Sequence, residues 1–441
     1  MKLNYQNLSS VIKNYKTSQN SFLSKEFFIP LEQEYTTDYK SLVNIGDEVK
    51  EGQVIASSIG KLSETTYIHS SVPGQVMDIL PVYTSSGKQK YAIKIKLGGK
   101  FSYLGKKIKE KDLELFTSQD IISELINKGV VNTFNIKKVY NVGLQIKNSK
   151  SKNLIVRLFD EDPFRFTDSL TSKFYPNEII TGAKILAKAM NASGILFVID
   201  SKFENKSLFD EINISNFRFL EIKTNKTPSV AKREIISAFS KSNLRKSCNF
   251  EVTKNDFFTD SSTLYEVYKA VVCNIPSISR LVHFSGNCLY SSCILDVKFG
   301  TPLKDIVNQL GGFAKEPSMI VINGLLYGNS VESLNVPITK SVKSVEFINK
   351  VKFTDSQIYS CVNCGNCRYV CPSKLSPDVI YSYVTDFHNL PQNITESIDK
   401  CESCFLCNTV CPARLPLTNT ISWLKEKLKK ENMEKTLENQ I

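Results

Sequence analysis

Two cysteine runs near the carboxyl end of the chain have residue types and spacing suited to redox chemistry. They are CVNCGNCRYVCP, from Cys361 to Pro372, and CESCFLCNTVCP, from Cys401 to Pro412. Each has the spacing C-x2-C-x2-C-x3-C-P, and together they use eight of the 12 cysteines. This spacing is typical of paired [4Fe–4S] clusters, in which three thiolates of a run bind one cluster and the fourth crosses to the other. The proline after each fourth cysteine turns the chain away.

The crossed pattern predicts two sets of iron ligands. The sets are Cys361, Cys364, Cys367 and Cys411 for cluster 1, and Cys401, Cys404, Cys407 and Cys371 for cluster 2. Zinc is the main alternative, but a zinc ribbon needs four ligands, usually two C-x2-C pairs, and it leaves the rest of each run unexplained. Two adjacent clusters would form a short path for electrons, which requires a donor and an acceptor.

The other potential ligands and nucleophiles are isolated in the sequence. They are Cys248, Cys273, Cys288, Cys293, His69, His283 and His388. Free cysteines are common as small buried side chains, so we expect the four cysteines of this group mainly to pack in the protein core, with a redox or ligand role as the alternative. No Walker A loop, H-E-x-x-H or G-x-S-x-G motif is present.

Composition indicates a multi-domain protein of a reducing compartment. At 441 residues the chain is long enough for about two to four domains. No apolar run has the length of a signal peptide or of a membrane span, so we expect a cytosolic chain without a transmembrane segment, in which clustered cysteines bind metal rather than form disulfides. The net charge of +12 suits nucleic acid, anionic headgroups or acidic partners, with a solvated, lysine-rich surface as the alternative. We expect no nucleic-acid partner, because the sequence contains no known nucleic-acid-binding module.

The cysteine runs follow several predicted domains. After a polar extension at 1–20, Val/Ile-rich segments alternate with the turns NIGD, KEG and VPG, which predicts an all-β unit at 21–104. It resembles the barrel-sandwich hybrid of biotinyl and lipoyl carriers. Lys61 lies in the turn that carries the cofactor in those proteins, but without the Met-Lys or Asp-Lys context, so a structural β domain is the better interpretation.

The middle of the chain predicts an α/β domain. Between 105 and 278, helical segments such as NEIITGAKILAKAMNAS alternate with strands such as GILFVID, which indicates a parallel, Rossmann-like sheet. Residues 279–350 have a small β-grasp-like (SLBB-like) pattern around the helix TPLKDIVNQLGG. We expect a helical two-cluster ferredoxin domain at 351–425 and a charged tail at 426–441. The predicted fold class is therefore multi-domain α/β plus β.

This order of domains resembles the C subunit of the bacterial Rnf complex, an ion-translocating electron transport complex. FFIPLEQEY, VNIGDEVKEGQVIA and HSSVPGQV are similar to its barrel; VHFSGNC, FGTPLKDIVNQLGG, INGLLYG and NVPITK are similar to its β-grasp segment. CVNCGNCRYVCPSKLSPDVI and CESCFLCNTVCPARLPL are similar to its cluster arms. The resemblance covers most of residues 21–425.

The resemblance implies a peripheral subunit on the cytoplasmic face of the cell membrane, with the other Rnf subunits and possibly ferredoxin as partners. The family moves electrons between ferredoxin and NAD and couples this to Na+ or H+ transport. Its α/β domain is similar to the NADH- and FMN-binding domain of respiratory complex I, so FMN and NAD(H) join the two [4Fe–4S] clusters as implied cofactors.

The chain departs from the family where the flavin and the nucleotide would bind. The family's loop G-x-G-G-A-G-F-P-T corresponds to NKGVVNTFNIKK, in which Gly129 is the only glycine. Its Y-P-x-G becomes KTPSVAKRE, and its N-V-G-T becomes TDSST. Glycines allow backbone N–H groups to approach phosphates closely, and bulkier side chains block that approach.

The acidic segment of the family, N-x-x-E-C-E-P, aligns with RLFDEDPFRFTDS. Asp160, Asp162, Pro163 and Asp168 fit the pattern, whereas Arg157 replaces the asparagine. We therefore expect an α/β domain retained for its shape, and binding of FMN and NADH by it stays open.

Three other interpretations of the sequence each differ from an Rnf-type C subunit in one feature. A cobalamin reductase of the microcompartment type shares these domains but has its flavin loop near the N-terminus, without a barrel domain before it. The A subunit of the sodium-pumping NADH–quinone reductase lacks the ferredoxin repeat. A docking subunit with purely structural clusters would share the cysteines but would not accept electrons.

Overall fold

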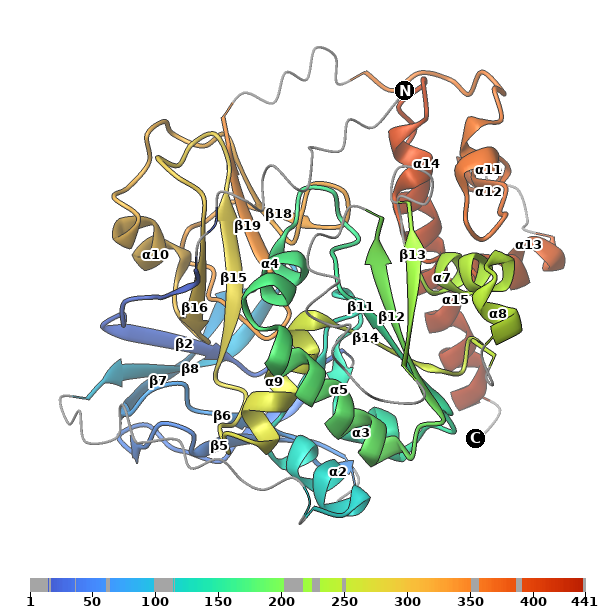
Figure 1. Ribbon diagram of the computed structural model, residues 1–441. Helices are drawn as coiled ribbons and strands as arrows, with labels where there is room; N and C mark the ends of the chain where they lie inside the picture. The colour runs from blue at the N-terminus through green and yellow to red at the C-terminus, as the bar shows by residue number, and fades with distance from the viewer. Residues whose placement is uncertain are drawn as a thin grey trace. The chain divides into compact units, whose positions relative to one another are not determined.

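A computed structural model describes residues 15, 17–35, 37–60, 64–98, 114, 116–201, 217–223, 231–247, 251–349, 357–385 and 391–438 (Figure 1). The chain divides into two compact units. The main unit comprises residues 5–223 and 238–351, and the cysteine unit comprises residues 1–4, 224–237 and 352–441. Lys61, Cys248 and His388 lie outside the described residues.

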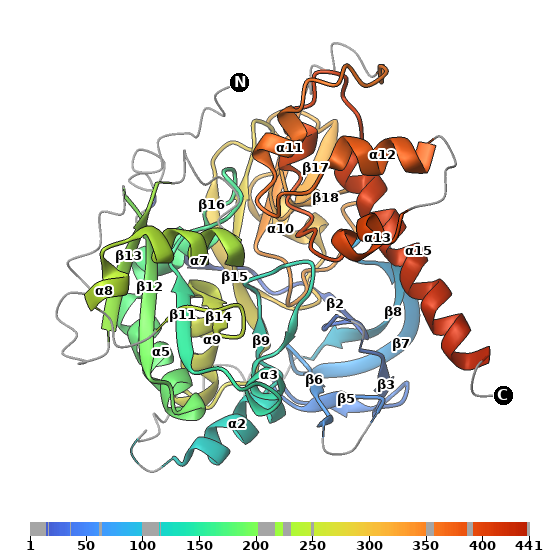
Figure 2. The ribbon, with the colours of Figure 1, turned by 90° about the vertical axis from the view of Figure 1, so that its right-hand side faces the viewer.

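Two small antiparallel sheets form the first part of the main unit (Figure 2). One has the order β2 (Glu26–Pro30), β8 (Gln89–Leu97), β7 (Gly74–Tyr83) and β4 (Glu48–Val49); the other has the order β3 (Tyr39–Ser41), β5 (Val54–Ser58) and β6 (Tyr67–His69). Alternate side chains of these strands, such as Phe27 and Ile29, point into a shared apolar core. Gly46 and Gly52 have positive φ in the predicted NIGD and KEG turns. The described residues between 21 and 98 contain strands and no α-helix.

A four-stranded parallel sheet forms the second part of the main unit. Its order is β13 (Phe217–Ile222), β12 (Gly194–Asp200), β11 (Asn153–Arg157) and β14 (Phe257–Asp260). The chain adds strands on one side of β11 and then places β14 on the other side. The strand order therefore reverses between β11 and β14, which is the position where open α/β sheets bind ligands.

Helices of this part of the chain bury apolar faces against the sheet. Its helices are α2 (Ser118–Asn127), α3 (Val142–Lys147), α4 (Thr167–Phe174), α5 (Pro176–Met190), α8 (Leu244–Ser247) and α9 (Ser261–Val271). Helix α7 (Lys232–Lys241) begins in the cysteine unit and ends in the main unit, because the boundary between the units lies after residue 237. A short ribbon of β9 (Val131–Asn132) and β10 (Tyr140–Asn141) joins α2 to α3. Apolar residues of α2, α3, α5 and α9 share one core with β11 and β12. Thr117 and Asp120 form a capping box that fixes the start of α2.

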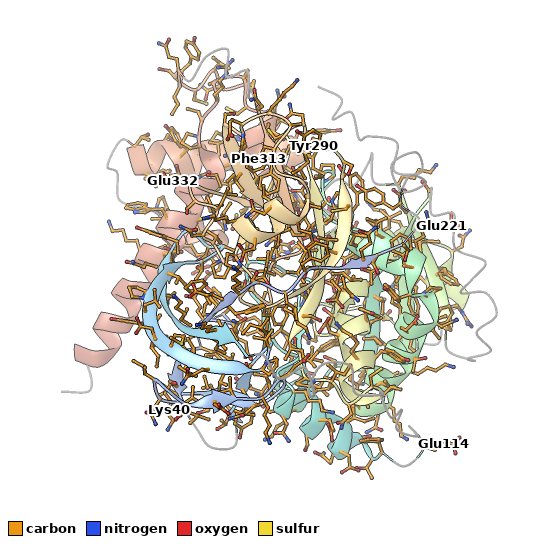
Figure 3. All side chains as sticks on the ribbon, turned by 90° about the vertical axis from the view of Figure 1, so that its left-hand side faces the viewer. Lys40, Glu114, Glu221, Tyr290, Phe313 and Glu332 are labelled. Carbon is orange, nitrogen blue, oxygen red and sulfur yellow. The ribbon has the colours of Figure 1, made fainter. Side chains whose placement is uncertain are left out.

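A mixed sheet with one covering helix forms the third part of the main unit. The order is β1 (Gln19–Asn20), β16 (Cys293–Lys298), β15 (Ser279–Ser285), β19 (Ser344–Ile348), β17 (Met319–Ile322) and β18 (Asn329–Val331), and the helix is α10 (Leu303–Gln309). Its core includes Phe347, against which Phe313 packs with ring centres 5.2 Å apart, while Tyr290 lies at the surface (Figure 3).

The described part of the cysteine unit contains helices within, between and after the two cysteine runs. Its helices are α11 (Asn366–Val370), α12 (Pro377–Thr385), α13 (Gln392–Ile398), α14 (Leu406–Thr409) and α15 (Leu417–Glu438). Helix α15 packs against α12 and α14, and α11 packs against α14. Among the described residues, no helix combines the length and the apolar character needed to span a bilayer.

Candidate iron–sulfur centres

The two cysteine runs follow the same backbone path. Equivalent positions in the runs have positive φ: 52° at both Asn363 and Ser403, 73° at Gly365 and 60° at Phe405, and 53° at Lys374 and 57° at Arg414. Left-handed conformations are unfavourable for most side chains and persist where the surrounding structure requires them. Their repetition in both runs shows that the two runs share the same tight winding of the chain.

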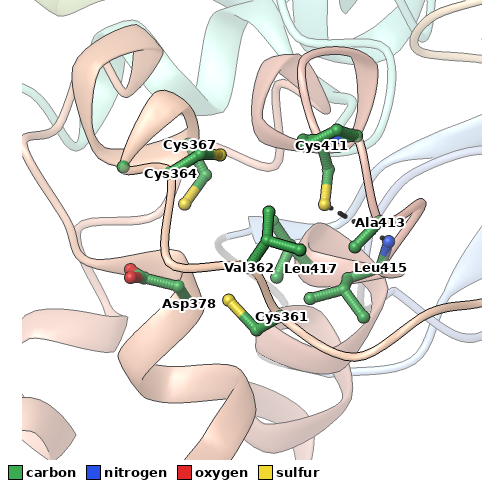
Figure 4. Close-up of a pocket in the computed structure, with 11 residues that line it drawn as sticks. Cys361, Val362, Cys364, Cys367, Asp378, Cys411, Ala413, Leu415 and Leu417 are labelled. Carbon is green, nitrogen blue, oxygen red and sulfur yellow. Dashed lines mark hydrogen bonds between the residues drawn. The ribbon is translucent and has the colours of Figure 1, made fainter.

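The winding brings four cysteines around one hollow (Figure 4). Cys361, Cys364, Cys367 and Cys411 line it, and the space there that holds no protein atoms, open solvent included, is about 310 Å³. Three of these cysteines come from the first run and one from the second. Apolar side chains and one carboxylate complete the wall: Val362, Ala413, Leu415, Leu417 and Asp378.

A second hollow of nearly equal size has the reciprocal composition. Cys401, Cys404, Cys407 and Cys371 line it, and the corresponding space, open solvent included, is about 320 Å³. Each hollow is therefore lined by three cysteines of one run and one cysteine of the other. In the part of the chain that the structure describes, no group of His, Cys, Asp and Glu side chains converges closely enough to hold a single metal ion.

Backbone N–H groups point at the sulfur atoms in matching positions of the two runs. Leu375 N donates to Cys371 Sγ at 3.3 Å, and Leu415 N donates to Cys411 Sγ at 3.4 Å. In the second hollow, Ser403 N donates to Cys401 Sγ at 3.4 Å. Hydrogen bonds to cysteine sulfur raise the reduction potential of a bound cluster, so these contacts belong to the geometry expected of a redox site.

The two hollows differ in their exposure. Cys361 and Cys364 at the first hollow are exposed, whereas Cys401 and Cys404 at the second are partly covered. Burial raises the pKa of the Cys404 thiol to about 12 and that of Cys407 to about 11. A bound metal ion would have to displace these thiol protons, because only thiolates ligate iron.

The carboxyl ends of β11 and β14 carry a buried cluster of charged side chains, which we call the ionic cluster. It consists of Arg157, Asp160, Glu161, Arg165, Asp168, Asp260 and Lys343. Arg157 and Arg165 both pair with Glu161, Arg165 pairs with Asp160, and Lys343 pairs with Asp168 and Asp260. Three of these residues were noted in the sequence analysis. Asp160 and Asp168 fit the acidic segment of the family, and Arg157 replaces its asparagine.

Lys343, on which the ionic cluster depends, was not predicted from the sequence. It lies in the segment before β19, far from the acidic segment in sequence, and an isolated lysine is ordinarily a surface residue. Only the tertiary structure brings it there. Every acidic group of the ionic cluster therefore has a cationic partner within the chain.

Comparisons with known proteins agree with this architecture. The family model described as the RnfC barrel sandwich hybrid domain matches residues 11–100. The C subunit of the proton-translocating ferredoxin:NAD(+) oxidoreductase complex of Clostridium ljungdahlii is 25% identical over 359 residues, which is 80% of this chain and 77% of that protein. This chain is a relative of the Rnf C subunit.

Other Rnf-type relatives match over the same extent. The C subunit of the ion-translocating oxidoreductase complex of Buchnera aphidicola is 23% identical over 82% of this chain and 71% of its own length. That of the Na(+)-translocating ferredoxin:NAD(+) oxidoreductase complex of Acetobacterium woodii is 22% identical over 80% of both chains. The chain thus has a barrel-sandwich hybrid domain of the RnfC type and a mixed α/β fold.

A solved structure of an NAD+-reducing [NiFe]-hydrogenase in the H2-reduced state also superposes on part of the chain. The TM-score is 0.46 at 10% sequence identity, and the match covers 69% of this chain and 60% of the hydrogenase chain.

Proposed function

We propose that this chain is an electron-transfer subunit of an Rnf-like ferredoxin/NAD oxidoreductase complex that translocates ions. In this role it binds two [4Fe–4S] clusters, works with the other subunits of the complex and possibly ferredoxin, and lies peripherally on the cytoplasmic face of the membrane. The similarity to the Rnf-type relatives over about four fifths of the chain supports the assignment to such a complex.

One observation carries the proposed mechanism: two hollows of similar size, each lined by three cysteines of one run and one of the other. The clusters would supply reversible one-electron transfer. The residues of the chain hold them. Crossed ligation would connect each cluster to both runs, and the packing of α11 on α14 keeps the runs together. The N–H groups of Leu375 and Leu415 stabilise negative charge on the sulfur atoms of Cys371 and Cys411.

The unequal exposure of the hollows distinguishes an outer cluster from an inner one. Cys361 and Cys364 of the first hollow are exposed, whereas no cysteine of the second hollow is, so a partner protein can approach cluster 1 more closely than cluster 2. We therefore assign cluster 1 as the point of exchange with an external redox partner and cluster 2 as the inner member of the pair.

Cysteine variants test the crossed ligation. In anaerobically purified chain we expect about eight irons, and Cys411→Ser should perturb the same electron paramagnetic resonance (EPR) signal as Cys361→Ser, with loss of about half of the iron. Cys273→Ser, outside both runs, is the matched control and should keep full iron content. If Cys411→Ser instead perturbs the signal that depends on Cys401, the crossed assignment is wrong.

A further inference from the structure

We infer that the ligand crevice of the α/β sheet is filled by the chain's own side chains, so that this chain holds neither FMN nor NADH. Electrons then reach its clusters from another protein rather than from a nicotinamide bound to this chain. The first statement stands on the main unit alone, and only the second rests on the proposed function.

The ionic cluster lies where a ligand would bind. Open α/β sheets bind ligands outside the carboxyl ends of their strands, at the point where the strand order reverses. That point lies between β11 and β14, whose last residues, Arg157 and Asp260, are direct neighbours in the register of the sheet. Both side chains belong to the ionic cluster.

The N-terminus of α9, which a phosphate group could otherwise use, is already occupied. Asp260 is its N-cap, and its carboxylate accepts a hydrogen bond of 2.8 Å from Thr263 N. A helix N-terminus at a strand end is the usual seat of a nucleotide phosphate, because its free N–H groups and dipole attract anions. Here a carboxylate of the chain takes that place.

Lys343 neutralises this carboxylate from the other side. Its ammonium group lies 2.6 Å from Asp260 Oδ2 and 2.7 Å from Asp168 Oδ2, and all three side chains are 0% exposed. Burial alone would raise the pKa of Asp260, but Lys343 holds it well below its usual range. The charge of Lys343 is thus already engaged by two carboxylates of the chain and does not serve to attract a phosphate to α9.

The departures from the family pattern contact one another in the crevice. Arg157, which replaces the family's asparagine, lies over the ring of Phe134 at 4.3 Å and donates to Phe134 O at 3.2 Å. Thr133 Oγ1 donates to Asp260 Oδ2 at 3.0 Å, and Thr133 N donates to Thr263 Oγ1 at 3.0 Å. Three altered segments, the former glycine-rich loop, the start of the acidic segment and TDSST, therefore form one mutually bonded set.

The loop after β11 is held shut by the neighbouring sheet. Asp162 Oδ2 accepts hydrogen bonds from Leu326 N at 2.8 Å and Tyr327 N at 2.9 Å, in the turn between β17 and β18. Arg165 pairs with Asp160 at 2.9 Å within the loop. A ligand entering the crevice would have to break buried ion pairs, and the charges left behind would be unpaired in a dry interior, which is strongly unfavourable.

Binding experiments on the full wild-type chain test this inference. FMN, followed by its fluorescence, and NADH, followed by calorimetry, should show no saturable binding up to about 1 mM. Hydrogen exchange at the Ser262 and Thr263 amides should be the same with and without either compound. One FMN or one NADH bound per chain, with slower exchange at these amides, would overturn the inference. Iron content, measured on the same sample, tests the proposed function separately.

A variant shows whether the crevice is filled as a set or blocked by one residue. Arg157→Asn restores the residue type of the family at that position; we expect it to loosen the crevice, with at least about tenfold faster exchange at Thr263, and to gain no FMN binding. Arg245→Asn, at an exposed position, is the matched control and should change neither the amide exchange at Thr263 nor the binding of FMN. Stable folding of Arg157→Asn with one FMN bound would show that Arg157 alone blocks a flavin site, and would overturn the inference that a set of side chains fills the crevice.

Discussion

Lys343 is the residue on which the buried charge balance of the main unit depends. Its replacement by methionine removes the ammonium group that pairs with both Asp168 and Asp260 and leaves these two carboxylates at full burial. Breaking a buried pair in this way costs about 3–5 kcal/mol of unfolding free energy. We predict a loss of this size for Lys343→Met, measured by urea unfolding with circular dichroism.

Lys90→Met is the control for this prediction. Lys90 pairs with Glu32 at the surface, where both side chains are about one third exposed, and such pairs contribute less than about 1 kcal/mol. Equal losses for the two variants would mean that the ionic cluster does not stabilise the fold.

The cysteine ligands could be predicted from the sequence far better than the residues of the ionic cluster. The grouping of Cys371 with the second run and of Cys411 with the first could be predicted because the spacing of both runs matches the two-cluster ferredoxin pattern, in which the fourth cysteine crosses to the other cluster. The role of Lys343 has no local signal. Arg157 is recognisable as a departure, but its contact with Phe134 depends on two loops that only the folded sheet brings together.

The turn between β17 and β18 is the element that fixes the acidic loop. Gly324 has φ of +95°, and a Cβ added there would overlap the Asp162 carboxylate. Gly324→Ala should therefore displace this carboxylate from Leu326 N and Tyr327 N and lower the unfolding free energy by about 2–4 kcal/mol. Amide exchange at Leu326 and Tyr327 would report the displacement directly.

Gly311→Ala separates this effect from backbone strain. Gly311 has φ of +88° but no atom within 4 Å of an added Cβ, so its replacement costs only the strain of the left-handed conformation, about 1 kcal/mol. If both glycine variants lose the same stability, the contact with Asp162 contributes nothing.

Elements with strong periodicity were predicted well, and elements that depend on distant partners were not. GILFVID is strand β12, and the helix predicted at NEIITGAKILAKAMNAS is α5, which begins at Pro176. By contrast, Gln19 and Asn20, expected in a polar extension, pair as β1 with β16 of the third sheet. A two-residue strand carries no alternation of its own, so its partner decides its conformation.

The main unit as a whole should respond to pH through Glu346, a buried carboxyl of β19 with one oxygen lacking a hydrogen-bond partner among the described residues. Burial raises the pKa of Glu346 to about 8. The negative charge of Asp162 adds to this rise, and the positive charge of Arg165 partly offsets it. Since the folded state binds this proton more tightly than the unfolded state, stability from this group is present below about pH 4.5 and is lost as the pH rises through about 8.

Glu346→Gln should therefore match the wild type near pH 5 and be more stable by about 2–4 kcal/mol near about pH 8.5. The single tryptophan, Trp423, reports on the cysteine unit, so the main unit is better followed by hydrogen exchange at β19. Glu48→Gln, at an exposed position, is the control and should show no such pH dependence. A constant difference between Glu346→Gln and wild type across this range would show that Glu346 does not titrate as argued.

The division of the molecule into a main unit without a flavin site and a cysteine unit with two cluster sites is the central claim. The measurement that tests it most directly is EPR of the anaerobically purified full chain, with dithionite and NADH added to separate samples. We predict that dithionite gives interacting signals of two reduced [4Fe–4S] clusters, and that NADH gives none. Reduction of the clusters by NADH alone, or zinc in place of iron, would contradict the account.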